Sequence, residues 1–345
     1  MPNPYFGTDK PVFIIAEIGA NHNGDIDLCL KTMDAAAECG ASAIKLQLYT
    51  AAELVADTER VWAWGPEGKQ VEEQVGAMFD RLSLSREEFA RAYEHAQQLG
   101  LPLFTTPFSV QGVGVLEELG NPIYKVASSD LSYYPLLDAM AQTGKPVILS
   151  TGKSPIEDVF DALEHLKSVD AADVAVLHCL AQYPAPVEQM NMRVVSMYRA
   201  LFPQHPTGLS DHCMTHDPAL ASVALGGSII EKHFTLGHDL YGPDHWFSMD
   251  PQQLRELVSR VRDLEKSLGD GQKRIAECEQ WEATYSRRSI IVMRDLVAGQ
   301  AITEEDLAML RPGTGLHPRQ WRTVIGKRAR SAVPARTPLA WHHLE

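Results

Sequence analysis

Eight short apolar segments, each followed by a segment with helical spacing of apolar residues, recur over the first 265 residues of the chain. Strands that are buried on both faces have nearly continuous apolar sequences, as these segments do. Eight such units in about 255 residues are typical of a (β/α)8 TIM barrel. A doubly wound sheet usually has fewer strands and a glycine-rich first turn, and the chain has neither GxGxxG nor GxxxxGK[ST]. The predicted strands lie at 12–19, 42–49, 101–108, 122–128, 145–151, 173–179, 206–212 and 228–234.

The pattern changes after the eighth unit. Residues 268–286 are polar and charged, which indicates a linker with some helix. Residues 287–345 have strand, turn and cap signals in quick succession, which indicates a small, mainly β module. We therefore predict an α/β protein with a TIM barrel over 1–267, a linker over 268–286 and a second domain over 287–345.

The charge of the chain limits its partners. A formal net charge of −14 argues against nucleic acid or an anionic membrane as the main partner. An anionic small substrate would need a local cluster of Lys or Arg. No signal peptide or membrane-spanning run is visible, and the five scattered cysteines lack CxxC spacing. These features favour a cytoplasmic protein with reduced thiols.

Polar residues recur at the ends of the predicted strands, where TIM barrels carry their chemistry. Charged side chains inside a barrel are unfavourable unless they are paired or used, and one such strand would fit a structural ion pair. Their presence on most of the eight strand ends favours an active site. The candidates are Glu17, Lys45, Gln47, Thr106, Lys125, Ser128, Ser150, Tyr183, Ser210, His212, Glu231 and His233.

The set contains two histidines, His212 and His233. A third histidine at a strand end, His178, is best interpreted as a hydrogen-bonded structural residue. His212 and His233 end neighbouring strands, which lie roughly 5 Å apart in a sheet. Two imidazoles with open positions suit a catalytic divalent ion, although two histidines do not choose among Mn, Co, Zn and Fe.

The lysines predict an anion pocket. Lys45 and Lys125, beside several hydroxyls, suit a phosphate or a carboxylate. A Schiff-base lysine is the competing use, but it needs no metal, so the histidine pair counts against it. The long segment 50–84, with Trp62 and Trp64, is either a lid or an oligomer contact.

Motifs along nearly the whole chain are familiar. The chain resembles the sialic acid synthase family, and its ending resembles that family's antifreeze-like domain. The resemblance rests on EIGANHNG (17–24), IKLQLY (44–49), TTPF (105–108), YKVASSD (124–130), ILSTGK (148–153), HCLAQYPAP (178–186), GLSDH (208–212), EKHFT (231–235), GPDHWFSMD (242–250) and RRSIIVMRDLVAGQAITEEDLAMLRPGTGL with IGKRA.

The resemblance implies a reaction. Members condense phosphoenolpyruvate with an open-chain N-acylhexosamine and water, giving a nine-carbon 2-keto sugar acid and phosphate. N-acetylmannosamine, which gives N-acetylneuraminate, is the expected sugar. By the resemblance, His212 and His233 bind a divalent metal ion, usually manganese, and Glu231 positions the attacking water or handles protons.

The resemblance also implies substrate contacts and a domain-swapped homodimer. In that dimer Arg311 reaches the sugar from the partner chain. The expected phosphoenolpyruvate ligands are Lys45, Thr106, Lys125, Ser128, Ser150 and Ser210. The expected sugar contacts are Glu17, Gln47, Tyr183 and Asp244.

Two departures from the family pattern leave alternatives open. Ala181 lies near the place of an Asn that sialic acid synthases usually carry before their Tyr-Pro, and the segment 62–70 lacks a clear match to a sugar-contacting Asn. A legionaminic, pseudaminic or other nonulosonate synthase is therefore an alternative. A metal aldolase or sugar isomerase is a second alternative. A catalytically inactive polysaccharide-binding protein is an alternative of another class.

Overall fold

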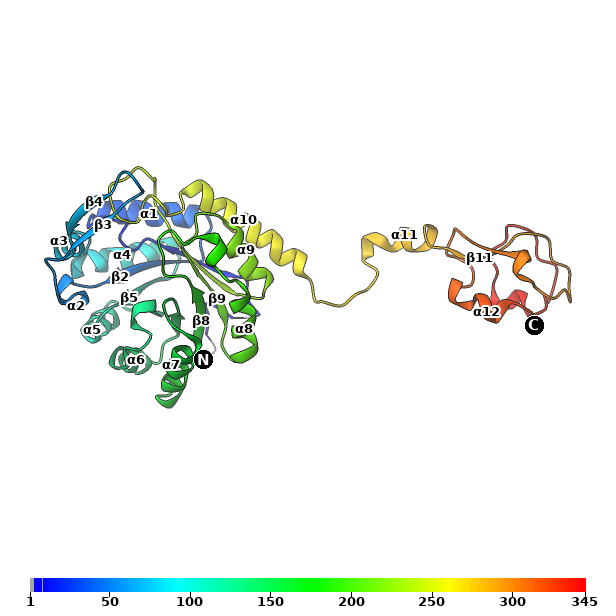
Figure 1. Cartoon of the computed structure of the whole chain (residues 1–345), viewed down its shortest axis with the longest axis horizontal. Coiled ribbons are helices and arrows are strands. Elements are labelled where there is room, and N and C mark those ends of the chain that lie inside the picture. The colour runs from blue at the N-terminus through cyan, green and yellow to red at the C-terminus, as the bar shows by residue number, and fades with distance from the viewer. Residues whose placement is uncertain (1–2, 8) are drawn as a thin grey trace. The chain divides into compact units, whose positions relative to one another are not determined.

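Two compact units make up the chain, residues 1–269 and residues 270–345 (Figure 1). The computed structural model describes residues 3–7 and 9–345. The first unit contains all the predicted strands and helices of the barrel. The second unit begins within the segment predicted as a linker and contains the C-terminal module.

Within the described residues, the first unit is a closed barrel of eight parallel strands, which confirms the predicted fold. Each strand pairs with its neighbour in the chain, and β2 and β10 both pair with β1, which closes the barrel. The strands are β1 (Phe13–Glu17), β2 (Ala43–Leu48), β5 (Leu103–Pro107), β6 (Tyr124–Val126), β7 (Val147–Ser150), β8 (Val174–Cys179), β9 (Thr207–Asp211) and β10 (Ile229–His233).

Helices surround the strands (Figure 1). Each barrel strand is followed by a helix that leads back to the next strand. These helices are α1 (Ile26–Glu38), α4 (Arg86–Leu99), α5 (Val110–Glu118), α6 (Tyr134–Ala141), α7 (Ile156–Ser168), α8 (Arg193–Leu201), α9 (Asp217–Ala224) and α10 (Pro251–Leu268). Short 3-10 turns, η1 (Ser128–Asp130) and η2 (Val187–Gln189), follow β6 and β8.

The long segment after β2 is folded rather than irregular. It contains α2 (Ala51–Leu54), the strands β3 (Val61–Trp64) and β4 (Val71–Gln74), and α3 (Val75–Arg81). The two strands form an antiparallel hairpin in which Trp62 lies opposite Glu73. The predicted lid segment is therefore a hairpin supported by two helices.

Local signals explain where several helices begin. Ser85 and Glu88 form a capping box at the start of α4, and Gly100 ends that helix in the left-handed conformation. Asp250 caps α10, with Pro251 at its first position. These caps satisfy backbone groups that a helix end leaves unpaired.

Side chains alternate along each barrel strand between two apolar layers. On β1, Ile14 and Ala16 pack against the surrounding helices, whereas Phe13 and Ile15 pack inside the barrel. The next inward position is Glu17. The other strands repeat this change, so the barrel interior is apolar toward the strand starts and polar toward the strand ends. This polar layer is where the predicted site residues lie.

The second unit has its own small core of buried aliphatic side chains. Its elements are η3 (Glu277–Glu279), α11 (Gln280–Tyr285), β11 (Ser289–Val292), η4 (Glu304–Asp306), β12 (Leu307–Leu310), η5 (Pro318–Gln320), α12 (Trp321–Val324) and η6 (Trp341–His343). Strands β11 and β12 pair in antiparallel, and further isolated bridges link the loops. The module is thus a small β-rich domain, as predicted.

Candidate active site

Inward side chains from most of the barrel strands meet in one pocket of about 160 Å³ at the strand ends. The pocket is lined by 11 of the predicted site residues: Lys45, Gln47, Thr106, Lys125, Ser128, Ser150, Tyr183, Ser210, His212, Glu231 and His233. Glu17 lies directly beneath, bonded to two of them. The period-2 alternation of the strands therefore gathers residues that are far apart in the sequence.

A network of buried charges forms the floor of this pocket. Lys45 donates to Glu17 and to Thr106 Oγ1 (3.2 Å), and its Nζ lies 3.9 Å from Glu231 Oε1. Lys125 Nζ lies 3.8 Å from the same Glu231 oxygen. All four charged side chains are nearly inaccessible to solvent. Two lysines and two carboxylates therefore balance each other in the absence of a ligand.

Mutual attraction sets the ionisation of these groups. Burial raises the pKa of Glu231, but Lys125 and Lys45 outweigh burial and hold that pKa at about 2. Burial lowers the pKa of Lys45, yet Glu17 and Glu231 reverse the effect and raise it. Lys125 differs, because burial outweighs Glu231 and its pKa is lowered. Lys45 and Glu231 are thus held as a charged pair.

The glycine at position 19 leaves room for the side chain of Glu17 in its hydrogen-bonded position. Gly19 has a left-handed φ of +49°, and a Cβ at this position would lie 2.5 Å from Glu17 Oε1. The same Cβ would lie 2.9 Å from Gln47 Nε2, which donates to Glu17 Oε1 at 2.7 Å. Only glycine satisfies both the backbone conformation and the close approach. The turn after β1 therefore presses directly on the Glu17–Gln47 pair.

Hydroxyl groups complete the anion-binding character of the pocket. Lys125 donates to Ser150 Oγ (2.6 Å), and Ser210 Oγ donates to Glu231 (3.0 Å). Ser128 Oγ accepts from the backbone N–H of Gly152 (2.9 Å). Ammonium and hydroxyl donors around one small cavity are suited to phosphate or carboxylate oxygens.

His212 and His233 lie side by side at the rim, with ring centroids 5.4 Å apart. Burial, and then the neighbouring His233, lower the pKa of His212 to about 3, so its imidazole is neutral at physiological pH. Its Nδ1 is 2.9 Å from the Leu180 carbonyl, which fixes the ring and leaves Nε2 free. Tyr183 packs over this ring with centroids 4.1 Å apart.

The donor atoms at this rim fit a divalent metal ion. His233 Nδ1 is buried and has no hydrogen-bond partner, and the nearest carboxylate oxygen, Asp244 Oδ2, is 3.4 Å away. A neutral imidazole held by a backbone carbonyl and a second imidazole with a free nitrogen are the expected ligand pair. No group of three or more His, Cys, Asp or Glu suited to a metal occurs in the described residues. The arrangement thus fits a two-histidine site that leaves other positions to water and substrate.

Family comparison agrees with this geometry. A protein-family model described as the NeuB family matches residues 32–273, and one described as the SAF domain matches residues 287–345. The chain belongs to the NeuB family. The resemblance to sialic acid synthases with an antifreeze-like ending is confirmed.

Individual relatives of this NeuB-family chain are similar over nearly their whole length. An N,N'-diacetyllegionaminic acid synthase of Legionella pneumophila is 36% identical over 98% of this chain and 96% of its own. A pseudaminic acid synthase of Helicobacter pylori is 32% identical over 97% of this chain and 98% of its own. The solved structure of an N-acetylneuraminic acid synthetase from Leptospira borgpetersenii, in complex with citrate, has 33% identity and a TM-score of 0.72. That match covers 80% of this chain and 91% of the solved one. The chain is therefore an enzyme of the synthase type that this family comprises.

Three predicted site residues of the NeuB-family chain do not line the pocket. Glu17 is one of them, and it pairs with Lys45 and Gln47 instead. Asp244 lies next to it, beside His233. Arg311 lies in the second unit, where its peptide bond to Pro312 is cis. Six pocket-lining residues were missing from the predicted set: Phe108, Ala127, Ser129, Lys153, Cys179 and Ala181. The STGK motif placed Lys153 at a strand end, and that signal was sufficient to find it.

A hydrogen-bonded cluster beside the pocket was also missed. His245 Nδ1 is 2.6 Å from Thr235 Oγ1, and its Nε2 is 3.2 Å from Asn23 Nδ2. Asn21 Nδ2 donates to the Phe234 carbonyl and to Ser248 Oγ. This cluster ties the turn after β1 to the loop that carries Asp244.

Aromatic contacts place the predicted lid near the same loop. Trp64 packs against Tyr241 with centroids 5.1 Å apart, and the Arg81 guanidinium lies 5.3 Å from the Tyr241 ring centroid. Trp62 packs against Phe79. The segment 50–84 thus contacts the loop 236–247 at Tyr241, through one edge-to-face aromatic contact and one cation–π contact.

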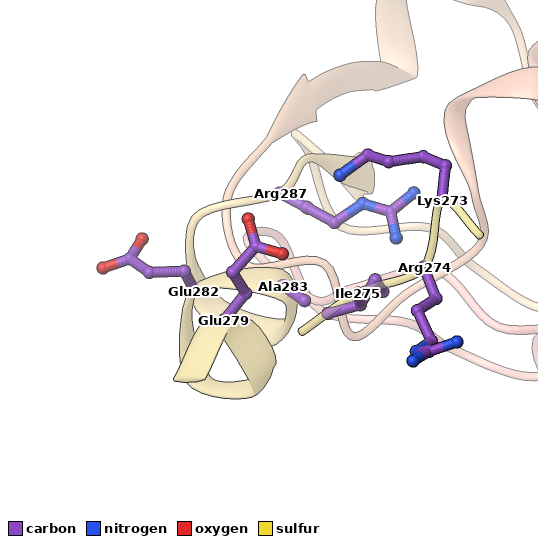
Figure 2. A pocket seen from close by; sticks show the side chains of 7 residues that line it. All are labelled: Lys273, Arg274, Ile275, Glu279, Glu282, Ala283 and Arg287. Atoms are coloured by element: carbon purple, nitrogen blue, oxygen red, sulfur yellow. The ribbon is translucent and has the colours of Figure 1, made fainter. Parts of the chain in front are cut away.

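A second hollow, of about 490 Å³, lies in the C-terminal unit (Figure 2). It is lined by both positively and negatively charged side chains, and nearly all its lining residues are exposed. None of the predicted site residues lines it. It is lined by Lys273, Arg274, Ile275, Glu279, Glu282, Ala283 and Arg287. An open surface of this kind lacks the buried, converging groups of the barrel pocket.

Two further polar residues of the barrel, His178 and Lys232, have structural roles outside the pocket. His178 Nε2 is 2.6 Å from the Met190 carbonyl, as expected for a structural histidine. Lys232 points away from the pocket and donates to Asp211 Oδ2 (3.0 Å) and to the Cys213 carbonyl. In the part of the chain that the structure describes, no helix has the length and apolar character needed to cross a membrane.

Proposed function

We propose that the barrel pocket condenses phosphoenolpyruvate with an open-chain N-acylhexosamine and water, giving a nine-carbon 2-keto sugar acid and phosphate. One observation carries the proposal. A cavity of about 160 Å³ joins buried lysines and hydroxyls to a pair of neighbouring histidines. The first group suits a small multiply charged anion, and the second suits the electrophilic end of a carbonyl substrate.

The reaction forms a carbon–carbon bond and a carbon–oxygen bond, and it breaks the bond between C2 and the phosphate oxygen. C3 of phosphoenolpyruvate bonds to the aldehyde carbon of the sugar, whose oxygen takes a proton. Water then adds to C2, and the resulting intermediate loses inorganic phosphate to leave the 2-keto acid. C3 is a weak nucleophile, so the site must hold both partners close together and stabilise the developing charge.

Residues of the pocket fit these tasks. Lys45 and Lys125 hold the anion, with Thr106, Ser128, Ser150 and Ser210 as hydroxyl partners. In this proposal the sugar contacts are Gln47 and Tyr183 in the pocket, with Glu17 and Asp244 beside it. Glu231 Oε2 is buried without a hydrogen-bond partner, so it is free to accept a hydrogen bond from water and orient it.

His212 and His233 hold a divalent metal ion in this proposal, with manganese as the first candidate. When bound, the ion supplies Lewis-acid polarisation of the aldehyde and orientation of water. The chain contributes two imidazoles, orientation of the His212 ring through the Leu180 carbonyl, and aromatic cover of that ring from Tyr183.

Two sugars deserve a direct comparison. N-acetylmannosamine is the sugar expected from the resemblance. A 2,4-diacetamido-6-deoxyhexose is the second candidate, favoured by Ala181 in the pocket wall and by similarity to the Legionella pneumophila diacetyllegionaminic acid synthase. The two differ at the far end of the sugar, away from the reacting carbon.

We also propose a homodimer in which Arg311 of one chain reaches the sugar site of the partner. Large aromatic side chains on α11 of the second unit support an interface, since Trp281 and Tyr285 are 64% and 51% exposed. A cytoplasmic location is proposed on the strength of five free cysteines in the described residues.

Phosphate release tests the function. The purified chain is incubated with phosphoenolpyruvate, each sugar and Mn²⁺, with EDTA and no-sugar controls, and the product is weighed by mass spectrometry. Sugar-dependent release with a nine-carbon product supports the proposal and identifies the sugar. Turnover of a sugar without phosphoenolpyruvate points to an aldolase or isomerase. No reaction with any sugar, together with polysaccharide binding, points to an inactive binding protein.

A further inference from the structure

A third lysine, Lys153, lines the pocket and has no part in the reaction as described above. It follows Gly152 in the turn after β7. Its side chain is exposed, and its φ of +63° is left-handed, which is unfavourable for a residue with a Cβ. Strained backbone of this kind is often retained where it positions a functional side chain.

The charge balance of the pocket suggests that Lys153 binds the anionic substrate. Lys45 and Lys125 are matched by the carboxylates of Glu17 and Glu231. Among the described residues, Lys153 forms no ion pair within 4.0 Å. Phosphoenolpyruvate carries close to three negative charges at neutral pH, so a pocket whose buried cations are already paired needs further positive charge.

The position of the turn indicates which end of the anion Lys153 meets. Ser150 and Ser128, the hydroxyls on the β6–β7 side, flank it: Ser150 ends β7, and Ser128 accepts from the N–H of Gly152. The histidines and Tyr183 lie on the side of β8 to β10. A phosphoryl group among the serine hydroxyls would therefore lie beside Lys153.

Tight packing fixes this turn. A Cβ on Gly152 would lie 2.9 Å from the Cβ of Ala181, 2.9 Å from Ser128 Oγ and 3.1 Å from Cys179 Sγ. Ala181 is small enough to let the turn approach, and its side chain offers no donor of its own. The neighbouring Lys153 places an ammonium donor at this wall.

We propose that Lys153 binds the phosphoryl group of phosphoenolpyruvate and supplies the net positive charge that the paired lysines lack. The proposal rests on the proposed function of the pocket. It makes Lys153 a substrate-binding residue in a chain whose Ala181 cannot donate a hydrogen bond from its side chain.

A structural role beside Asp130 is the competing explanation. Asp130 Oδ2 is buried without a hydrogen-bond partner, and Lys153 is near enough to favour the ionised carboxylate. The two explanations predict opposite effects of neutralising Asp130. If Lys153 serves the ligand, losing a nearby negative charge strengthens anion binding. If Lys153 serves only Asp130, both neutralising changes disturb the turn in the same way.

Calorimetric titration of the full chain with phosphoenolpyruvate, and separately with inorganic phosphate, tests the proposal without any sugar. Lys153→Met should weaken both ligands about tenfold, as expected for one charge-assisted contact at a partly exposed site. Lys153→Arg should keep most of the affinity. Asp130→Asn should bind both ligands as tightly as the original chain or more tightly. Lys167→Met, an exposed lysine on α7, is the matched control and should change neither affinity.

Unchanged affinity of Lys153→Met for both ligands would overturn the proposal. Equal weakening by Lys153→Met and Asp130→Asn would also overturn it and favour the structural role. Failure of the proposed function gives a different result, because the unmodified chain would then bind no phosphoenolpyruvate at all.

Discussion

Removing the cation of Lys45 should destabilise the barrel strongly, because two buried carboxylates, Glu17 and Glu231, both pair with it. Lys45 is 4% exposed and Glu17 is fully buried. In Lys45→Met, Glu17 loses its only ion-pair partner among the described residues, and Glu231 keeps only Lys125. Breaking one side of a buried pair costs about 3–5 kcal/mol of unfolding free energy.

The second change separates charge from packing. In Lys45→Met combined with Glu17→Gln, the uncompensated carboxylate is gone and the amide at position 17 can still accept from Gln47. We expect the double variant to recover at least half of the lost stability, which would show as coupling in a double-mutant cycle. Neither variant should bind phosphoenolpyruvate normally, because both lack the Lys45 ammonium.

Scanning calorimetry of the full chain measures this effect. For a unit of this size, a loss of 3–5 kcal/mol corresponds to a fall in melting temperature on the order of 10 °C. The transition of the C-terminal unit should not move and serves as an internal reference. Lys145→Met, which breaks a more exposed pair with Glu117, should change stability by less than about 1 kcal/mol. A barrel transition in Lys45→Met within 2 °C of the original, or a double variant less stable than the single one, would refute this reasoning.

Three further predictions follow from the same geometry. Gly19→Ala should lower the melting temperature and weaken phosphoenolpyruvate binding, whereas Gly120→Ala, which has a positive φ but open space around it, should show only the smaller backbone effect in both assays. His212→Ala should weaken Mn²⁺ binding at least tenfold in a titration followed by electron paramagnetic resonance; unaltered affinity would exclude this histidine as a ligand. Burial lowers the pKa of His22 to about 4, although Glu88 and Asp25 nearby act to raise it. Between pH 6.5 and pH 4 the unfolded chain therefore binds more protons than the folded chain. The unfolding free energy should fall as the pH drops through this window, by about 2–3 kcal/mol at pH 4. His22→Asn should flatten that dependence in urea titrations at several pH values, and an equally steep dependence would show that His22 is not its source.

The sequence predicted the barrel because parallel strands buried on both faces leave a strong signal in one dimension. Each of the eight apolar runs became a barrel strand. The alternation of side chains then placed Lys45 with Gln47 and Glu231 with His233 on inward faces, and the structure brings all four into one pocket. Local periodicity was sufficient for these residues because, in a closed barrel, every second side chain of each strand points into the same interior.

Features that depend on the packing of distant loops were out of reach. The cluster of Asn23, Thr235 and His245 joins residues more than 200 positions apart, and no local pattern links them. The sequence does not predict the hairpin at 61–74, because both strands are short and mostly exposed and the second, Val71–Gln74, is largely polar. Pairing geometry that arises only in three dimensions has no signature in one sequence.

The charge balance of the pocket also required coordinates. Polar strand ends predicted lysines and carboxylates near each other, but only distances show that Glu231 lies within 4 Å of both lysines. The same distances reveal Lys153 as the lysine without a paired carboxylate among the described residues of the pocket. The sequence suggested an anion pocket, and the geometry indicates where its excess positive charge lies.

Carbon-13 NMR with phosphoenolpyruvate labelled at C3 tests the central proposal most directly. In the presence of Mn²⁺ and the sugar that supports phosphate release, the labelled carbon should become a methylene that is coupled to the former aldehyde carbon of a sugar labelled at C1. That coupling requires a new carbon–carbon bond and cannot arise from hydrolysis. Labelled pyruvate with unchanged sugar, or no consumption of phosphoenolpyruvate with either candidate sugar, would contradict the account.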